Sequence, residues 1–161
     1  MSGAYLEDFA VGEVITSGED YEMTPERIHE FANEYDPQSI HLDPAVAEHE
    51  FFGGIIASGW HSLSVTMRLM VRANVFGGAP VIGVSVDSLR YLAPVNPGDR
   101  LSARAEVLET RPSGNHPERG YLVLRVTTWR HDGTQVLTQD WTVLVPRREL
   151  IRRDIRAPSG A

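Results

Sequence analysis

The stretch that organises this chain runs from residue 35 to residue 64. It contains YDPQSIHLDP (residues 35–44) and FFGGIIASGWHS (residues 51–62). Because Pro37 rules out a regular helix between Asp36 and His41, we expect this carboxylate and this imidazole to lie together on a loop. Such a pair can transfer protons. The free N–H groups of a helix that starts near Ser58 could face a developing negative charge.

The segment before this stretch is predicted to form a helix that delivers Asp36 at its C-terminal end. Thr24 suits an N-cap and Pro25 suits the first helical position. Apolar residues then fall on one helical face, at Ile28, Phe31, Ala32 and Tyr35. Pro37 ends the helix just beyond. A second, short helix is expected from Ala45 to His49, after Asp43-Pro44 and before the FFGG turn.

A long apolar helix is predicted after Ser58, which reads as its N-cap. Residues at helical spacing are apolar with little polar interruption, namely Trp60, Leu63, Met67, Met70 and Val71. We therefore expect about four turns, buried on most of the surface and ending near Asn74 or Gly77-Gly78. Trp60, Met67 and Met70 are expected in the core, where some could also line an acyl tunnel.

Most of the remaining chain alternates with period two. This pattern predicts strands at 81–91, 101–109, 121–130 and 136–145, with a hairpin tip at Asp132-Gly133. A short edge strand is expected in residues 5–15. The order predicts an α+β fold in which an antiparallel sheet wraps around the long helix. Open sheet edges also favour pairing with a second subunit.

Composition restricts the class of protein. The 161 residues, 42% hydrophobic, suit one domain, which we place at 1–146 and follow with an arginine-rich tail at 147–161. Residues 1–50 hold 13 of the 22 acidic residues and one basic residue, Arg27, so nucleic acid is an unfavourable partner. No cysteine, leader pattern or apolar run of about 18 residues is present, so we expect a cytoplasmic protein outside the membrane.

These residues resemble the MaoC-like acyl dehydratases, a family that includes the R-specific enoyl-CoA hydratases and has the hotdog fold. The resemblance covers most of the chain. It is carried by Phe9-x-Val11-Gly12, the loop from Asp36 to His41 with Leu42-Asp43-Pro44, Gly54-Ile55-Ile56-Ala57-Ser58-Gly59, Leu89-Arg90-Tyr91 and Pro94-Val95-Asn96-Pro97-Gly98-Asp99. The Asp-x4-His spacing followed by a glycine-containing helix start is specific mainly in combination.

The resemblance implies reversible syn addition of water to a trans-2-enoyl-CoA, giving an (R)-3-hydroxyacyl-CoA, as in fatty acid metabolism. Asp36 and His41 look like the catalytic pair that holds water, with His41 assigned as base and Asp36 as acid. Gly59 looks like the backbone donor to the thioester oxygen. The family further implies a homodimer or higher homo-oligomer whose pockets draw on both subunits. The substrate is a CoA thioester, and no cofactor is expected.

One departure from the family leaves alternatives open. The hydratases usually carry Asn-Pro between the two catalytic residues, where this chain has Gln38-Ser39. Glutamine could supply the same amide hydrogen bond with a longer reach. This departure motivates a non-catalytic acyl-CoA-binding subunit as one alternative. A thioesterase on the same fold is a second alternative, against which the Asp36–His41 pair argues. Asp36-Asn and His41-Ala replacements with product analysis would separate them.

Other side chains could in principle bind a metal, act as a nucleophile or hold phosphate. A metal site built from Asp36, His41, Asp43 and His49 matches no zinc spacing, so no metal is expected. Ser58 and Ser62 lack the G-x-S-x-G pattern of a nucleophilic serine. His61 is expected to pack on the long helix, and His29 and His49 to be exposed. Candidates for holding the CoA phosphates are Arg90, Arg147 and Arg148, since a guanidinium can grip phosphate.

Overall fold

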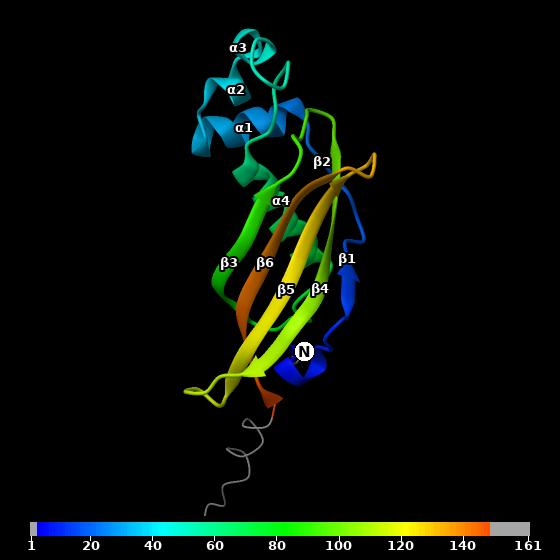
Figure 1. The fold of residues 1–161 in the computed structure, drawn as a ribbon, viewed down its shortest axis with the longest axis vertical. Coiled ribbons are helices and arrows are strands. Elements are labelled where there is room, and N and C mark those ends of the chain that lie inside the picture. Colours follow the sequence, from blue (N-terminus) through cyan, green and yellow to red (C-terminus); the bar gives the residue numbers. More distant parts are fainter. Residues whose placement is uncertain (1–2, 149–161) are drawn as a thin grey trace, which may run out of the picture.

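The computed structural model describes residues 3–148. Four helices, a short 3-10 helix and six strands lie within these residues (Figure 1). In chain order they are the 3-10 helix η1 (Leu6–Asp8), β1 (Val14–Thr16), β2 (Tyr21–Glu22), α1 (Pro25–Tyr35), α2 (Ser39–Leu42), α3 (Pro44–Glu48), α4 (Gly59–Arg72), β3 (Ile82–Tyr91), β4 (Arg100–Pro112), β5 (Arg119–Arg130) and β6 (Gln135–Pro146).

The strands form one antiparallel sheet in the order β1-β4-β5-β6-β3, with β2 also paired to β4. The four long strands confirm the predicted ones to within three residues at each end. Gly133 has φ of 84° at the tip between β5 and β6, where glycine adopts the left-handed region without strain. Strand β3 pairs with β6 and forms one edge of the sheet within the described chain.

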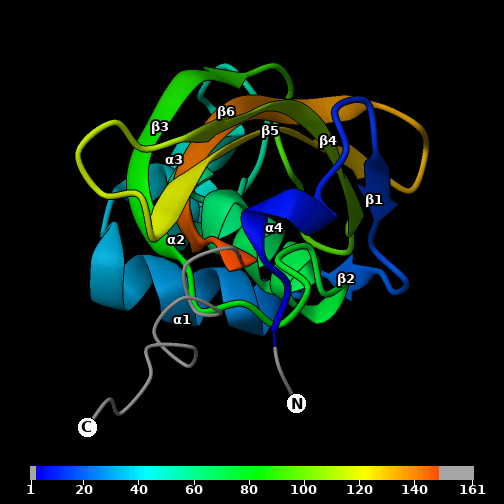
Figure 2. The same cartoon turned by 90° about the horizontal axis from the view of Figure 1, so that it is seen from below.

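The sheet curves around α4, as Figure 2 shows from below. Alternate residues of β4, β5 and β6 point inward and are buried. They pack against Val65, Leu69 and Met70 of α4, which are at most 4% exposed. Burial of this apolar surface is the main force that holds helix and sheet together. The α+β class and the hotdog arrangement are confirmed.

Helix α4 begins and ends as the sequence indicates. The Oγ of Ser58 accepts a hydrogen bond from the N–H of Trp60 at 3.2 Å, which satisfies one free donor of the first turn. At the other end, Asn74 has φ of 58°, and the N–H of Val75 donates to the carbonyl of Met70. This left-handed residue stops the helix.

Two expectations about local structure need correction. The predicted edge strand is present as β1, but it begins only at Val14, and residues 6–8 form η1, where the Asp8 carboxylate accepts from the N–H of Tyr5. Helix α4 is buried on one face only. Trp60 is 64% exposed and Met67 is 43% exposed, because the face that carries them points away from the sheet.

Helices α1, α2 and α3 gather at one end of the molecule, near the start of α4 and the final residues of β3 (Figure 1). Thr24 caps α1 by accepting from the N–H of Arg27, as predicted. Asp43 caps α3 through the N–H groups of Ala45 and Val46, so the short helix is confirmed. Among residues 3–148, no helix has the length and apolarity needed to cross a membrane.

Candidate active site

Asp36 lies at the C-cap of α1, where the chain leaves the helix. Its N–H donates to the carbonyl of Ala32, while its φ and ψ of −148° and 68° are no longer helical. Pro37 follows and prevents the helix from continuing. The end of α1 therefore fixes the backbone of Asp36 and turns its carboxylate toward the start of α4.

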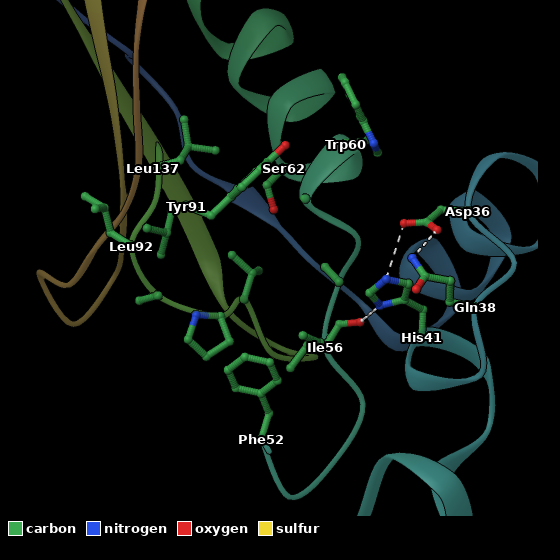
Figure 3. A pocket seen from close by; sticks show the side chains of 16 residues that line it. Asp36, Gln38, His41, Phe52, Ile56, Trp60, Ser62, Tyr91, Leu92 and Leu137 are labelled. Atoms are coloured by element: carbon green, nitrogen blue, oxygen red, sulfur yellow. Dashed lines mark hydrogen bonds and ion pairs between the residues drawn. The ribbon is translucent and has the colours of Figure 1, made fainter. Parts of the chain in front are cut away.

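His41 lies on α2, a single helical turn, rather than on the predicted loop. Pro37 prevents α1 from continuing, but it does not prevent a new helical turn, which begins at Ser39. The imidazole is 7% exposed. Its Nδ1 donates to the carbonyl oxygen of Ile56 at 2.7 Å, and its Nε2 lies 3.3 Å from the Oδ2 of Asp36 (Figure 3).

The Asp36 carboxylate accepts two further hydrogen bonds. The Oγ of Ser58 donates to Oδ2 at 2.6 Å, and the Nε2 of Gln38 donates to Oδ1 at 2.7 Å. Hydrogen bonds from Ser58 and then Gln38 lower the pKa of Asp36, with a smaller contribution from His41 and against the opposing effect of burial. The carboxylate is therefore ionised near neutral pH. The side chain of Gln38 thus supplies an amide hydrogen bond to the Asp36 carboxylate.

The hydrogen bonds also fix where a proton lies. The Ile56 carbonyl can only accept, so the Nδ1 of His41 carries hydrogen. The Oδ2 of an ionised Asp36 also accepts only, so the contact with Nε2 is attractive when Nε2 carries the second hydrogen. In that state the contact is an ion pair between an imidazolium and a carboxylate, with Nε2 and Oδ2 3.3 Å apart.

Gly59 is the first residue of α4 and lies at the same site. Its N–H donates to no acceptor within the described residues. The ring of Tyr91, from the end of β3, covers the Gly59 Cα. A Cβ at position 59 would lie 2.6 Å from the Tyr91 Cε1, closer than real Cβ contacts allow. Glycine is thus needed here for close approach.

A pocket of about 380 Å³ brings these groups together. Its polar lining side chains are Asp36, Gln38, His41, Ser62 and Tyr91, and Gly59 also lines it. The remaining lining residues are mainly apolar, among them Phe52, Ile56, Leu92, Val95 and Leu137. All three residues predicted for the site from the sequence therefore line one cavity, beside a helix N-terminus.

Several of the contacts could not be predicted from the sequence. Ser58 was expected only as a cap, yet it also hydrogen-bonds Asp36. The carbonyl of Ile56 leaves no signal in the sequence. Tyr91 is part of the Leu89-Arg90-Tyr91 motif that carries the family resemblance, but the sequence indicated no role for its side chain. Its place in the pocket depends on an irregularity in the pairing of β3 with β6 between Asp87 and Arg90, where Ser88 has φ of 53°.

The other candidate residues lie elsewhere or serve other contacts. Asp43 caps α3, and His29 and His49 are exposed as predicted. No group of three potential metal ligands forms within residues 3–148. His61 is buried and stacks on Phe31 with ring centroids 4.6 Å apart.

The arginine candidates are also separated in space. Arg147 contacts Glu7, and Arg148 contacts Asp8, at the end of the molecule opposite α2 and α3 (Figure 1). The rest of the predicted tail, with Arg152, Arg153 and Arg156, lies outside the described residues. Arg90 is exposed on β3 directly before Tyr91.

Comparisons with known proteins match most of this chain. The family model of the MaoC like domain matches residues 8–128. The chain is also 30% identical over 142 residues to the uncharacterized protein YdeM of Bacillus subtilis (strain 168), covering 88% of this chain and 99% of YdeM.

Solved structures are similar over nearly the whole chain. A MaoC-like dehydratase from Rhodospirillum rubrum is 37% identical, with a TM-score of 0.80 over 91% of this chain and 99% of its own. The R-hydratase PhaJ1 from Pseudomonas aeruginosa, without ligand, is 26% identical, with a TM-score of 0.71 over 91% of this chain and 88% of its own.

Proposed function

Because this chain belongs to the MaoC-like dehydratase family, we propose that it catalyses the reversible addition of water to a trans-2-enoyl-CoA, giving an (R)-3-hydroxyacyl-CoA. The observation that carries the proposal is the Asp36–His41 pair, with Nε2 and Oδ2 3.3 Å apart at one wall of the pocket. The proposed R configuration of the product is inferred from the similarity of the chain to the R-hydratase PhaJ1.

In this reaction two protons move at adjacent carbon atoms. As water attacks the β-carbon, it loses a proton, and the α-carbon gains one. The hydrogen bonds that lower the pKa of Asp36 favour an ionised carboxylate, which suits a base. We therefore assign Asp36 as the base toward water and the Nε2–H of His41 as the acid toward the α-carbon, the reverse of the division expected from the sequence.

The anchoring of each side chain supports this assignment. Ser58 and Gln38 hold the carboxylate, and Oδ1 keeps a second lone pair that can accept from water. The Ile56 carbonyl holds the imidazole ring in one orientation. After one turnover the Asp36 carboxyl group carries the proton taken from water and His41 is neutral, and the starting state returns when one proton leaves the carboxyl group and one binds the Nε2 of His41, directly or through solvent. No group beyond the CoA thioester is needed.

The N-terminus of α4 is proposed to stabilise the enolate. Negative charge develops on the thioester oxygen when water adds to the β-carbon. The N–H of Gly59 has no acceptor within residues 3–148 and lies where the helix dipole is positive. A preorganised donor at this oxygen lowers the barrier because the charge is absent in the ground state.

We further propose that the protein acts as a homodimer. Ile82, Val84 and Val86 are exposed on the edge strand β3. Beside them a groove of about 890 Å³ is lined by side chains that include Phe31, Trp60, Leu63, Met67, Val86 and Trp141. A second copy that covers this apolar surface would also border the pocket, because Trp60 lines both. Arg90, on the same strand, is then the candidate for a CoA phosphate.

The test follows the loss of enoyl-thioester absorbance with crotonyl-CoA. We expect hydration by the unmodified protein with an R product. Asp36→Asn and His41→Gln should each lower kcat about 100-fold or more, while His29→Gln, on the exposed face of α1, should not. Release of free CoA thiol instead would indicate a thioesterase. Binding of CoA esters without turnover would favour the non-catalytic alternative.

A further inference from the structure

The pocket is lined by the hydroxyl group of a buried serine that the proposed reaction does not use. Ser62 lies on α4 three residues after Gly59 and is 4% exposed. Its Oγ makes no hydrogen bond within residues 3–148, although its backbone N–H and carbonyl are both satisfied. Serine on a helix often donates to the carbonyl four residues earlier, as Ser64 does to Trp60. Ser62 instead lines the pocket.

A second hydroxyl lies on the same wall. Tyr91 reaches from the end of β3 toward the first turn of α4, and Figure 3 shows it beside Ser62, away from Asp36 and His41. Its hydroxyl oxygen would be 3.1 Å from a Cβ placed on Gly59, and it has no hydrogen-bond partner among the described residues. Two hydroxyl groups without protein partners thus converge on one part of the cavity.

The charge of the pocket restricts what these hydroxyls can bind. No arginine lines the cavity, and the Asp36 carboxylate is ionised near neutral pH. A second carboxylate on the acyl group would be repelled by Asp36 and would find no unpaired cation among the described lining residues, because the proposed imidazolium of His41 is already paired with Asp36. A neutral oxygen can accept from either hydroxyl or donate to it. The leftover hydrogen-bonding capacity therefore fits a hydroxyl or carbonyl oxygen.

The position along α4 indicates where on the substrate this oxygen lies. Three residues of α-helix advance about 4.5 Å along the axis. For an acyl chain that runs along α4 from a thioester oxygen held at the N–H of Gly59, this rise is about the distance from the thioester carbon to C4. Ser62 is also more deeply buried than the pocket mouth at Trp60, so it faces the acyl group rather than the CoA moiety.

We propose that Ser62 and Tyr91 form a subsite that hydrogen-bonds a neutral oxygen on the acyl group, near C4, so that short oxygenated enoyl thioesters are preferred over apolar ones. The inference rests on the proposed function for the placement of the thioester at Gly59. Discrimination by a hydroxyl on a buried residue such as Ser62 is stronger than discrimination by apolar contacts, because an analogue without the oxygen leaves this hydroxyl unpaired in the complex.

The test compares 4-hydroxybut-2-enoyl-CoA with pent-2-enoyl-CoA, in which a methyl group replaces the hydroxyl. We expect kcat/KM to favour the hydroxylated substrate by about tenfold or more in the unmodified protein. Ser62→Ala and Tyr91→Phe should each reduce this ratio severalfold, and the double variant should bring it close to one. Ser113→Ala and Tyr121→Phe, which remove hydroxyls outside the pocket, should keep the ratio. A ratio near one in the unmodified protein, or one that neither pocket variant changes, would overturn the subsite.

A binding measurement separates this inference from the proposed reaction. The affinities of 4-hydroxybutanoyl-CoA and pentanoyl-CoA, which cannot be hydrated, are compared by calorimetry in the same variants. If neither enoyl thioester reacts but the hydroxylated analogue binds about tenfold more tightly in a Ser62-dependent way, the subsite stands and the hydratase proposal fails. Equal affinities, or no binding of either analogue, overturn the subsite.

Discussion

The hydroxyl of Ser58 donates a 2.6 Å hydrogen bond to the Oδ2 of Asp36, across 22 positions of sequence. The same Oγ accepts from the N–H of Trp60 and so caps α4. The start of the central helix and the carboxylate of the site are thus held by one atom. A change at Ser58 should alter both the stability of the helix and the acidity of Asp36.

Replacement of Ser58 by alanine is expected to raise the pKa of Asp36, because a hydrogen bond to the charged form is lost. A base must be ionised to act, so the acidic limb of the kcat/KM profile should move to higher pH. Loss of the cap should also lower the free energy of unfolding by about 1 kcal/mol. Ser58→Thr, which keeps a hydroxyl, serves as the control. An acidic limb that stays in place would exclude this coupling.

Gly59→Ala should destabilise the protein through Tyr91 rather than through the helix. A Cβ at this position meets the Tyr91 ring at 2.6 Å, and overpacking of this kind costs about 1–3 kcal/mol. In a Tyr91→Ala background the same replacement should be neutral or stabilising, since alanine favours helix over glycine. Urea unfolding of the four proteins in this double-mutant cycle measures the coupling. Additive effects would contradict a direct contact.

His61 should make stability dependent on pH. Burial, with a smaller effect of Arg27, lowers its pKa from 6.5 to about 4, and its Nδ1 is buried without a partner in the described chain. Between these values the unfolded chain binds a proton that the folded chain does not. The free energy of unfolding therefore keeps its full value above pH 6.5. As the pH falls toward 4, protonation of His61 in the unfolded chain lowers it by on the order of 2 kcal/mol.

The His61 contribution is measured by urea unfolding between pH 4 and pH 7. His61→Gln should flatten the pH dependence across this window, whereas His29→Gln, which changes an exposed histidine on α1, should leave the slope unchanged. An identical slope in the unmodified protein and in His61→Gln would show that other groups cause the acid sensitivity.

The proposed dimer is tested on the edge strand. Val84 on β3 and Val14 on β1 are 51% and 49% exposed, and their strands form opposite edges of the sheet. Val84→Asp places a charge where the second subunit is proposed to pair, so it should convert dimer to monomer in sedimentation velocity. Val14→Asp is the matched control and should stay dimeric. The β3 interface would be wrong if both variants remained dimers.

The sequence was sufficient for the elements that depend on local chemistry. Thr24-Pro25 starts α1, Pro37 ends its continuation, and Ser58 starts α4, because caps and proline act on their own backbone neighbours. Period-two alternation located the four long strands, and in β4, β5 and β6 it corresponds to one buried and one open face, whereas the residues of β3 are exposed or half-buried. The pairing of Asp36 with His41 came from their spacing and the family motif rather than from any local rule.

The exposure of Trp60 and Met67 shows what an apolar sequence pattern does not predict. Both are apolar at helical spacing, yet which face of α4 meets the sheet depends on how β4, β5 and β6 curve around it. Apolar periodicity indicates that a helix face favours burial. It does not say whether that face is buried in the core of its own chain or against a partner subunit.

The sequence pattern determined the α+β class and the order of the long elements, and with the family resemblance it indicated the hotdog fold and three residues of the candidate site, Asp36, His41 and Gly59. Only the tertiary structure decided which contacts hold that site together. The Ile56 carbonyl accepts from His41, the Ser58 hydroxyl donates to Asp36, and the Tyr91 ring packs over Gly59. The reason is physical. Helix caps and strand alternation depend on neighbours within a few residues, whereas a hydrogen bond between distant residues depends on distances that only the packed sheet and helices fix.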